Sequence, residues 1–154
     1  RRWKRIAYMG ASKNLVVDEA RYNGYLQAHR DVGVQVDKNL VFREELSETA
    51  MRSHVKDILD RGADCIICQD DGVCNIVLDE LRIQGARIPE DIRVASCHNS
   101  KVLDNYPVSV TSLRFDNTEI GRVACSVLLD LLEGKEVPHK TILDYEVVLK
   151  ESTK

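Results

Sequence analysis

Short apolar runs alternate with longer segments of helical spacing along almost the whole chain. Apolar runs of strand length lie at 5–10, 39–42, 65–68, 92–97, 108–113 and 142–149, and each predicts a strand. The intervening spacing predicts helices over 14–31, from 47 to 61, from 70 to about 84, and over 116–133. A glycine ends each of these helices, as is common at helix C-termini: Gly33, Gly62, Gly85 and Gly134.

The predicted helices have recognisable starting residues and packing residues. Ser47, Asp70 and Asp116 are the expected N-caps, because their side-chain oxygens accept hydrogen bonds from the first free backbone amides. The first helix has small and apolar residues at helical spacing, namely Ala20, Gly24, Leu26 and Ala28.

Regular alternation of strands and helices predicts an α/β fold with a parallel, helix-flanked sheet of about five to six strands. Ligands of such sheets bind beyond the carboxyl ends of the strands, where helix N-termini also gather. We therefore expect the loops at 10–17, 42–47, 69–72 and 98–106 to share one functional edge.

Length and charge limit the possible classes of protein. The 154 residues predict a single domain spanning 1–154. Lys and Arg number 22 against 25 Asp and Glu, so the chain lacks the basic surplus of a module that grips nucleic acid phosphates. No apolar run is long enough for a membrane span, and no signal-peptide core follows the basic N-terminus.

The five cysteines indicate a reducing compartment, and thus a cytoplasmic protein, because they are odd in number and mostly lie in apolar runs. They predict buried free thiols. Cys65 and Cys68 have the spacing of a zinc or redox pair, but residues three apart on a strand face opposite ways and no second pair accompanies them. We expect no metal site and no cofactor.

No catalytic set is visible, so we expect a binding protein that is not an enzyme. The chain has neither a Gly-x-Ser-x-Gly elbow nor a phosphate-binding Gly-x-x-x-x-Gly-Lys loop. Cys97 and His98 are neighbours on a strand end and face opposite ways. A flavodoxin-like or receiver-like α/β protein is the less favoured alternative, because a receiver needs an acidic pair where this chain has Met9-Gly10-Ala11.

Several short motifs are each weak signals, but their combined order and spacing along the chain are characteristic of a known family. They are Lys4-Arg5-Ile6-Ala7-Tyr8-Met9-Gly10, Ala20-Arg21-Tyr22-Asn23-Gly24-Tyr25, the run from Asp64 to Asp71, Ile88-Pro89-Glu90-Asp91-Ile92, Thr111-Ser112-Leu113-Arg114 and Ile120-Gly121-Arg122-Val123-Ala124. With them, the chain resembles the C-terminal half of the effector-binding core of LacI/GalR-family transcriptional regulators, which is similar to periplasmic sugar-binding proteins.

The resemblance implies one lobe of a type I periplasmic-binding-protein-like fold. It implies a homodimeric bacterial regulator that binds a small polar effector between two lobes and binds DNA only through an N-terminal helix-turn-helix outside this chain. The helix at 116–133 would normally pack on the other lobe. Without that lobe, we expect the helix to pack back on its own lobe or on another copy. A lobe that only dimerises is the alternative.

The same resemblance nominates effector-binding positions in the first helix and after the second strand. Arg21 matches the second of two family arginines, whereas Glu19 stands where the first is expected. Glutamate accepts hydrogen bonds where arginine donates them, which favours either an amine-bearing effector over a sugar-like one or a loss of effector binding. The alternative is that Glu19 is only an exposed helix residue. Leu46 replaces an aromatic residue that would stack on a sugar.

Two further pairs complete the nominated site. Gln69-Asp70 replaces the usual Asn-Asp, with Gln69 offering an amide to the effector and Asp70 capping the next helix. His98 and Asn99 replace an aromatic residue and an acidic pair after the fourth strand. His98 is either a pH-dependent effector contact or a solvated loop residue, and Asn99 orients the loop.

Overall fold

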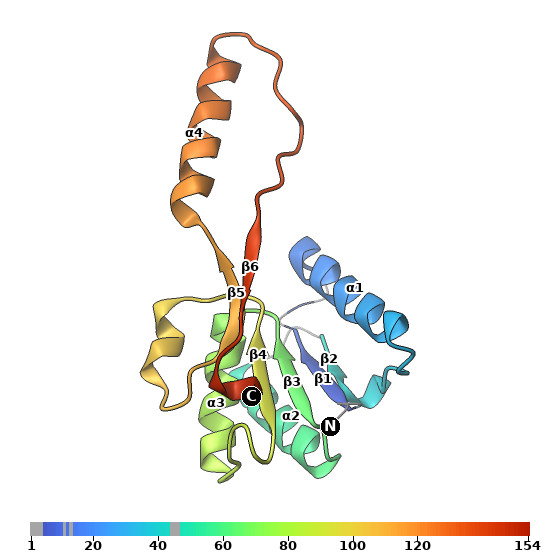
Figure 1. The fold of residues 1–154 in the computed structure, drawn as a ribbon. Helices are drawn as coiled ribbons and strands as arrows, with labels where there is room; N and C mark the ends of the chain where they lie inside the picture. The colour runs from blue at the N-terminus through green and yellow to red at the C-terminus, as the bar shows by residue number, and fades with distance from the viewer. Residues whose placement is uncertain (1–4, 11, 13, 44–46) are drawn as a thin grey trace.

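A six-stranded sheet forms the centre of the fold in the computed structural model, which describes residues 5–10, 12, 14–43 and 47–154. The strand order is β2-β1-β3-β4-β5-β6 (Figure 1). Neighbours from β2 to β5 pair in parallel, and β6 pairs antiparallel with β5. The predicted parallel, helix-flanked α/β sheet is confirmed, with one antiparallel strand added at its edge.

The elements follow the predicted alternation. The strands are β1 Ile6–Met9, β2 Val41–Phe42, β3 Cys65–Cys68, β4 Arg93–Ser96, β5 Thr111–Phe115 and β6 Tyr145–Val148. The helices are α1 Val16–Asp31, α2 Glu48–Asp60, α3 Asp71–Ile83 and α4 Asn117–Leu132, with short 3₁₀ helices η1 Lys38–Leu40, η2 Lys101–Asn105 and η3 Glu151–Thr153.

The predicted helix boundaries hold to within about two residues, whereas the strands predicted at 39–42, 108–113 and 142–149 begin two or three residues later than predicted. Ser47, Asp70 and Asp116 accept capping hydrogen bonds from the first turns of α2, α3 and α4. Gly62 and Gly134 have φ of 65° and 76°, a conformation that L side chains rarely adopt, so these helices end there. The fifth strand begins at 111 instead of 108, because the preceding residues pair with the C-terminal η3.

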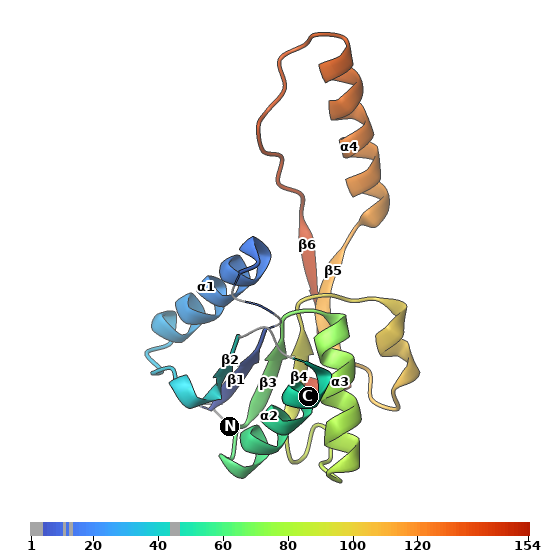
Figure 2. The ribbon, with the colours of Figure 1, turned by 180° about the vertical axis from the view of Figure 1, so that it is seen from behind.

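The main core lies between the sheet and helices α2 and α3, which cover the face seen in front in Figure 2. The alternate strand residues Ala7, Met9, Ile66, Cys68 and Val94 point into it. The helices contribute Met51, Val55, Ile58, Val73, Cys74, Val77, Leu78 and Leu81. These apolar faces recur at helical spacing, which is why the sequence pattern located both helices.

Helix α1 lies on the opposite face and packs through polar aromatic residues. Its buried residues are Asp18, Tyr25 and His29, whereas Ala20 and Ala28 are exposed. The Tyr25 ring lies 5.3 Å from that of Tyr8 on β1, and its hydroxyl donates to the Ile6 carbonyl at 2.8 Å. The small and apolar positions noted in the sequence are therefore not the face that α1 buries.

Strands β5 and β6 continue out of the sheet as a two-stranded ribbon that carries α4 away from the rest of the fold (Figures 1 and 2). None of the residues of α4 is buried, and Leu132 is 75% exposed. The prediction that this helix packs back on its own lobe is wrong, and packing on another chain stays a prediction. No helix in the described parts of the chain could cross a membrane.

The division between buried and exposed helix residues gives a stability test. Ile58 is fully buried on α2, and Ile83 is 65% exposed at the end of α3. We expect Ile58→Ala to lower the free energy of unfolding by about 3 kcal/mol, because it leaves a cavity. Ile83→Ala should change it by less than about 0.5 kcal/mol. Urea denaturation measures both, and equal effects would contradict the described core.

Candidate functional site: the carboxyl edge of the sheet

Backbone hydrogen bonds extend the sheet by one residue beyond its strands and bring the functional loops together. The Gly10 amide donates to the Phe42 carbonyl at 2.7 Å, and the Gln69 amide donates to the Met9 carbonyl at 2.9 Å. The Cys97 amide donates to the Cys68 carbonyl at 3.0 Å. The residues that follow β1, β2, β3 and β4 therefore share one edge, as the alternation predicted.

A buried ion pair joins α1 to the end of β2 at this edge. The Asp18 side chain is 0% exposed and receives a hydrogen bond from Arg43 Nε at 2.8 Å. The Tyr8 hydroxyl donates to the same carboxylate at 2.9 Å. The Arg43 guanidinium also lies 4.0 Å from the centre of the Tyr22 ring. These contacts fix the start of α1 over the sheet.

Glu19 is already paired in this arrangement. Arg43 Nη2 donates to its carboxylate at 2.6 Å, and Asn23 donates to it at 3.4 Å. The Arg43 hydrogen bond holds the pKa of Glu19 below its ordinary value. Glu19 is exposed, but the positive charge of Arg43 largely balances its negative charge. This pairing makes Glu19 a less suitable acceptor for an amine.

Arg21 lies on α1 near the end of β4. Burial raises the pKa of the Cys97 thiol, and the positive charge of Arg21 opposes that rise. Arg21 makes no hydrogen bond or ion pair with the described residues. Of the two nominated residues on α1, Arg21 is thus the one with donors available to a ligand.

The nominated residues after β3 divide into one buried residue and one cap. Gln69 is 1% exposed beneath the edge. Asp70 accepts a hydrogen bond from the Val73 amide at 2.8 Å, which confirms its capping role. The next residue, Asp71, is a contact that the sequence did not predict: its carboxylate lies 3.2 Å from His98 Nδ1.

The loop after β4 places His98 and Asn99 beside this helix start. The His98 ring is partly exposed between Asp71 and Phe115, whose ring centre is 6.5 Å away. Asn99 accepts a hydrogen bond from Lys150 Nζ at 3.3 Å, which ties its loop to the C-terminal segment. The structure therefore brings His98 to Asp71 beside the end of β3, where Gln69 lies, while Asn99 contacts the C-terminal segment.

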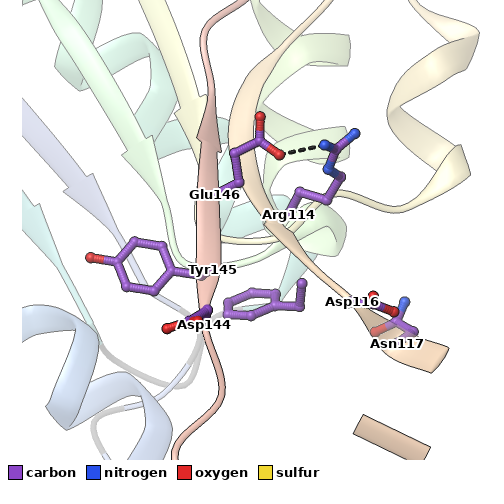
Figure 3. Close-up of a pocket in the computed structure, with 7 residues that line it drawn as sticks. Arg114, Asp116, Asn117, Asp144, Tyr145 and Glu146 are labelled. Atoms are coloured by element: carbon purple, nitrogen blue, oxygen red, sulfur yellow. Dashed lines mark hydrogen bonds and ion pairs between the residues drawn. The ribbon is translucent and has the colours of Figure 1, made fainter. Parts of the chain in front are cut away.

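A pocket of about 520 Å³ opens where β5 and β6 leave the sheet (Figure 3). Its lining comes from the two strands and the start of α4: Arg114, Phe115, Asp116, Asn117, Asp144, Tyr145 and Glu146. Arg114 and Glu146 form an ion pair across the strands. Because Phe115 faces His98, this pocket adjoins the carboxyl edge.

The sequence missed the residues that organise this edge. Asp18, Arg43 and Tyr8 come from three elements, and the only local signals were an acid in a first helical turn and a charge directly after a short strand. Leu46, the remaining nominated residue, lies outside the described residues.

The cysteines partly follow the prediction. Cys68 and Cys74 are buried and Cys65 is partly buried, and burial raises the pKa of the Cys65 thiol to about 12. Cys125 is exposed on α4, contrary to the expected burial, because nothing in the described chain covers that helix. No group of three or more metal-ligating side chains occurs among the described residues.

Solved structures share this arrangement. The transcription regulator CcpA of Lactococcus lactis aligns with a TM-score of 0.88 and 29% identity, over 99% of this chain and 56% of that chain. A complex of the transcriptional regulator CelR with cellobiose aligns with a TM-score of 0.86 and 25% identity, over 97% of this chain and 47% of that chain. The fold and its polar edge define a periplasmic-binding-protein-like lobe.

Related sequences give the family. Residues 1–153 match the periplasmic binding protein-like domain, and the chain belongs to this family. It is 26% identical over 154 residues to the HTH-type transcriptional repressor CytR of Escherichia coli strain K12, and 26% identical over 152 residues to the HTH-type transcriptional regulator CelR of Thermobifida fusca. The matches cover 98% and 97% of this chain but 45% of each relative. The resemblance to the effector-binding core of LacI/GalR-family regulators is confirmed.

The Asp18–Arg43 pair predicts a large and specific loss of stability. Arg43→Met leaves the buried Asp18 carboxylate without its cation and should lower the free energy of unfolding by about 3 kcal/mol. Arg30→Met is the control, because Arg30 is exposed and its side chain bonds Gln27 alone among the residues that the structure describes, and it should cost less than about 0.5 kcal/mol. Adding Asp18→Asn to Arg43→Met should recover part of the loss. Equal costs for the two single variants would contradict the structural role of the pair.

Asp71 predicts a pH dependence. Burial favours a raised pKa, but hydrogen bonds from Ser100 and His98 outweigh it and hold the pKa of Asp71 below its ordinary value of 3.8. A pKa lower in the folded state than in the unfolded chain means that Asp71 stabilises the fold above about pH 4 and loses that effect as the pH falls further. The Tm of Asp71→Asn should therefore fall less between about pH 5 and about pH 3 than that of the unmodified chain. Asp60→Asn, at an exposed helix end, should retain the original profile; an unchanged profile for Asp71→Asn would refute the assignment.

Proposed function

We propose that this chain is the second lobe of the effector-binding core of a bacterial DNA-binding transcriptional regulator that acts in the cytoplasm. The lobe would bind a small polar effector at its carboxyl edge, with another lobe closing over it. The chain spans less than half the length of the CytR and CelR relatives, which leaves room in such proteins for a first lobe and a DNA-binding segment.

One observation carries the proposal: the polar edge lies at the foot of the same ribbon that carries the uncovered α4. The apolar side of α4 includes Ile120, Leu128 and Leu131, and with the returning segment at 138–143 it lines a groove of about 460 Å³. Isolated soluble proteins rarely leave such a patch uncovered. A lobe packed on α4 would stand directly above the edge formed by Arg21, Gln69 and His98.

This geometry supports a closure mechanism. An effector held on this lobe by Arg21, Gln69 and His98 would contact the other lobe only when the two lobes are close. The bound effector would therefore favour the closed state. In a two-fold dimer, closure would move the DNA-binding segments relative to each other. The coupling is set by the difference in effector affinity between the open and closed states. The CelR–cellobiose complex shows that a relative binds a sugar; in this chain, sugar-like and amine-bearing effectors are both candidates.

The test is a ligand screen on this chain and on the longer protein with its first lobe. Sugars, amino sugars, polyamines and nucleosides are added while Tm is measured. A ligand at 100 times its Kd should stabilise the two-lobed protein by about 2.7 kcal/mol and so raise Tm by several degrees. Arg21→Ala and His98→Ala should remove most of the shift. Arg61→Ala, at the exposed end of α2, should not.

The screen also separates the alternative function. If the two-lobed protein responds to none of these compounds and its DNA affinity is unchanged by them, effector sensing is contradicted. A dimer in solution would then favour a lobe whose role is dimerisation alone.

A further inference from the structure

The pocket where β5 and β6 leave the sheet contains two aromatic rings on one side of a strand pair. Phe115 and Tyr145 are direct partners in the antiparallel register, so both side chains project from the same face of the ribbon. Tyr145 is 65% exposed although it is large and aromatic. No described element covers these rings from the pocket side, and they offer flat surfaces to a ligand.

The charges around the rings are mainly negative. Three carboxylates line the pocket, Asp116, Asp144 and Glu146, and the single guanidinium of Arg114 pairs with Glu146 on the face of the ribbon opposite the rings. Arg114 is held by Glu146, and Asp116 accepts hydrogen bonds from the amides of α4. Asp144 makes no hydrogen bond or ion pair within the described part of the chain. Its carboxylate is thus available, and the surplus negative charge attracts cations.

We propose that this pocket binds a positively charged organic group of the effector, a protonated amine or a planar cation, against the rings of Phe115 and Tyr145 and the carboxylate of Asp144. Aromatic faces attract cations through their quadrupoles, and a carboxylate at the same site adds an ion pair. The inference rests on the proposed function, because His98 and Phe115 join the pocket to the effector edge.

The sequence pointed to Glu19 on α1 as the residue that would recognise an amine, whereas this proposal assigns that role to the β5–β6 ribbon. Glu19 is balanced by Arg43, whereas Asp144 has no such partner among the described residues. Both strands of the ribbon lead to α4, so an effector bound here would also stiffen the connection that carries α4. The pocket therefore contributes both specificity and a contact to the moving part of the fold.

Two small probes test the pocket on the ¹⁵N-labelled chain by NMR titration. Benzylammonium carries the cation, and benzyl alcohol is its neutral analogue of similar shape. We expect benzylammonium to shift the amide signals of 114–117 and 144–146 in a saturable way, and to bind at least about tenfold more tightly than benzyl alcohol. Raising the salt concentration should weaken benzylammonium binding only.

Matched variants assign the effect to its residues. Asp144→Asn keeps the shape but removes the charge, and should weaken benzylammonium binding at least about fivefold. Tyr145→Leu should also weaken it, and because Tyr145 is exposed, unchanged amide signals elsewhere would show that the fold is intact. Asp60→Asn, a carboxylate on α2 away from the pocket, should bind the probe as the unmodified chain does.

Equal binding of the two probes, or full binding by Asp144→Asn, would overturn the inference. Cellobiose titrated into the same sample keeps the two proposals distinguishable. Shifts at Gln69 and His98 with cellobiose, combined with no preference for benzylammonium, would overturn the cation pocket while the effector-binding lobe stands.

Discussion

Parallel pairing of β1, β3 and β4 sends the carboxyl ends of the buried strands to one edge, and the chemistry of this protein follows from that constraint. Strands β1 and β3 are mostly apolar because helices cover both faces of this part of the sheet. Polar side chains such as those of Gln69 and His98 follow directly after the strand ends. Backbone bonds such as that from the Cys97 amide to the Cys68 carbonyl then hold those residues in one row.

The edge is kept in register by polar contacts, in contrast to the aliphatic packing elsewhere. Helix α1 has little apolar surface to bury, and it is anchored by Tyr8, Tyr25 and the Asp18–Arg43 pair. A buried ion pair stabilises a fold only while both partners are present, and its geometry is specific. Here that geometry orients the start of α1 and with it Arg21. The same pairing occupies Glu19, which is why we propose other residues for ligand binding.

The ribbon of β5 and β6 separates the compact part of the fold from α4. Its antiparallel edge pairs Phe115 with Tyr145 and Arg114 with Glu146, so aromatic and charged groups gather where the ribbon leaves the sheet. At the end of this two-stranded ribbon, the apolar side chains of α4 are not buried by the rest of the described chain. The fold thus combines a polar edge, which we propose binds the effector, with an uncovered apolar helix, and the β5–β6 ribbon joins the two.

The sequence by itself determined the alternation of elements, the helix caps at Ser47, Asp70 and Asp116 and the shared edge, because these depend on local periodicity and capping chemistry. The family was indicated by the resemblance of its motifs in order and spacing. Only the tertiary structure decided which face α1 buries and which charges are balanced. Asp18 and Arg43 are 25 residues apart, so their pairing has no local signature. Only the fold showed that α4 lies away from the rest of its lobe. An apolar stripe predicts that a helix packs against a partner, but it does not predict where that partner lies.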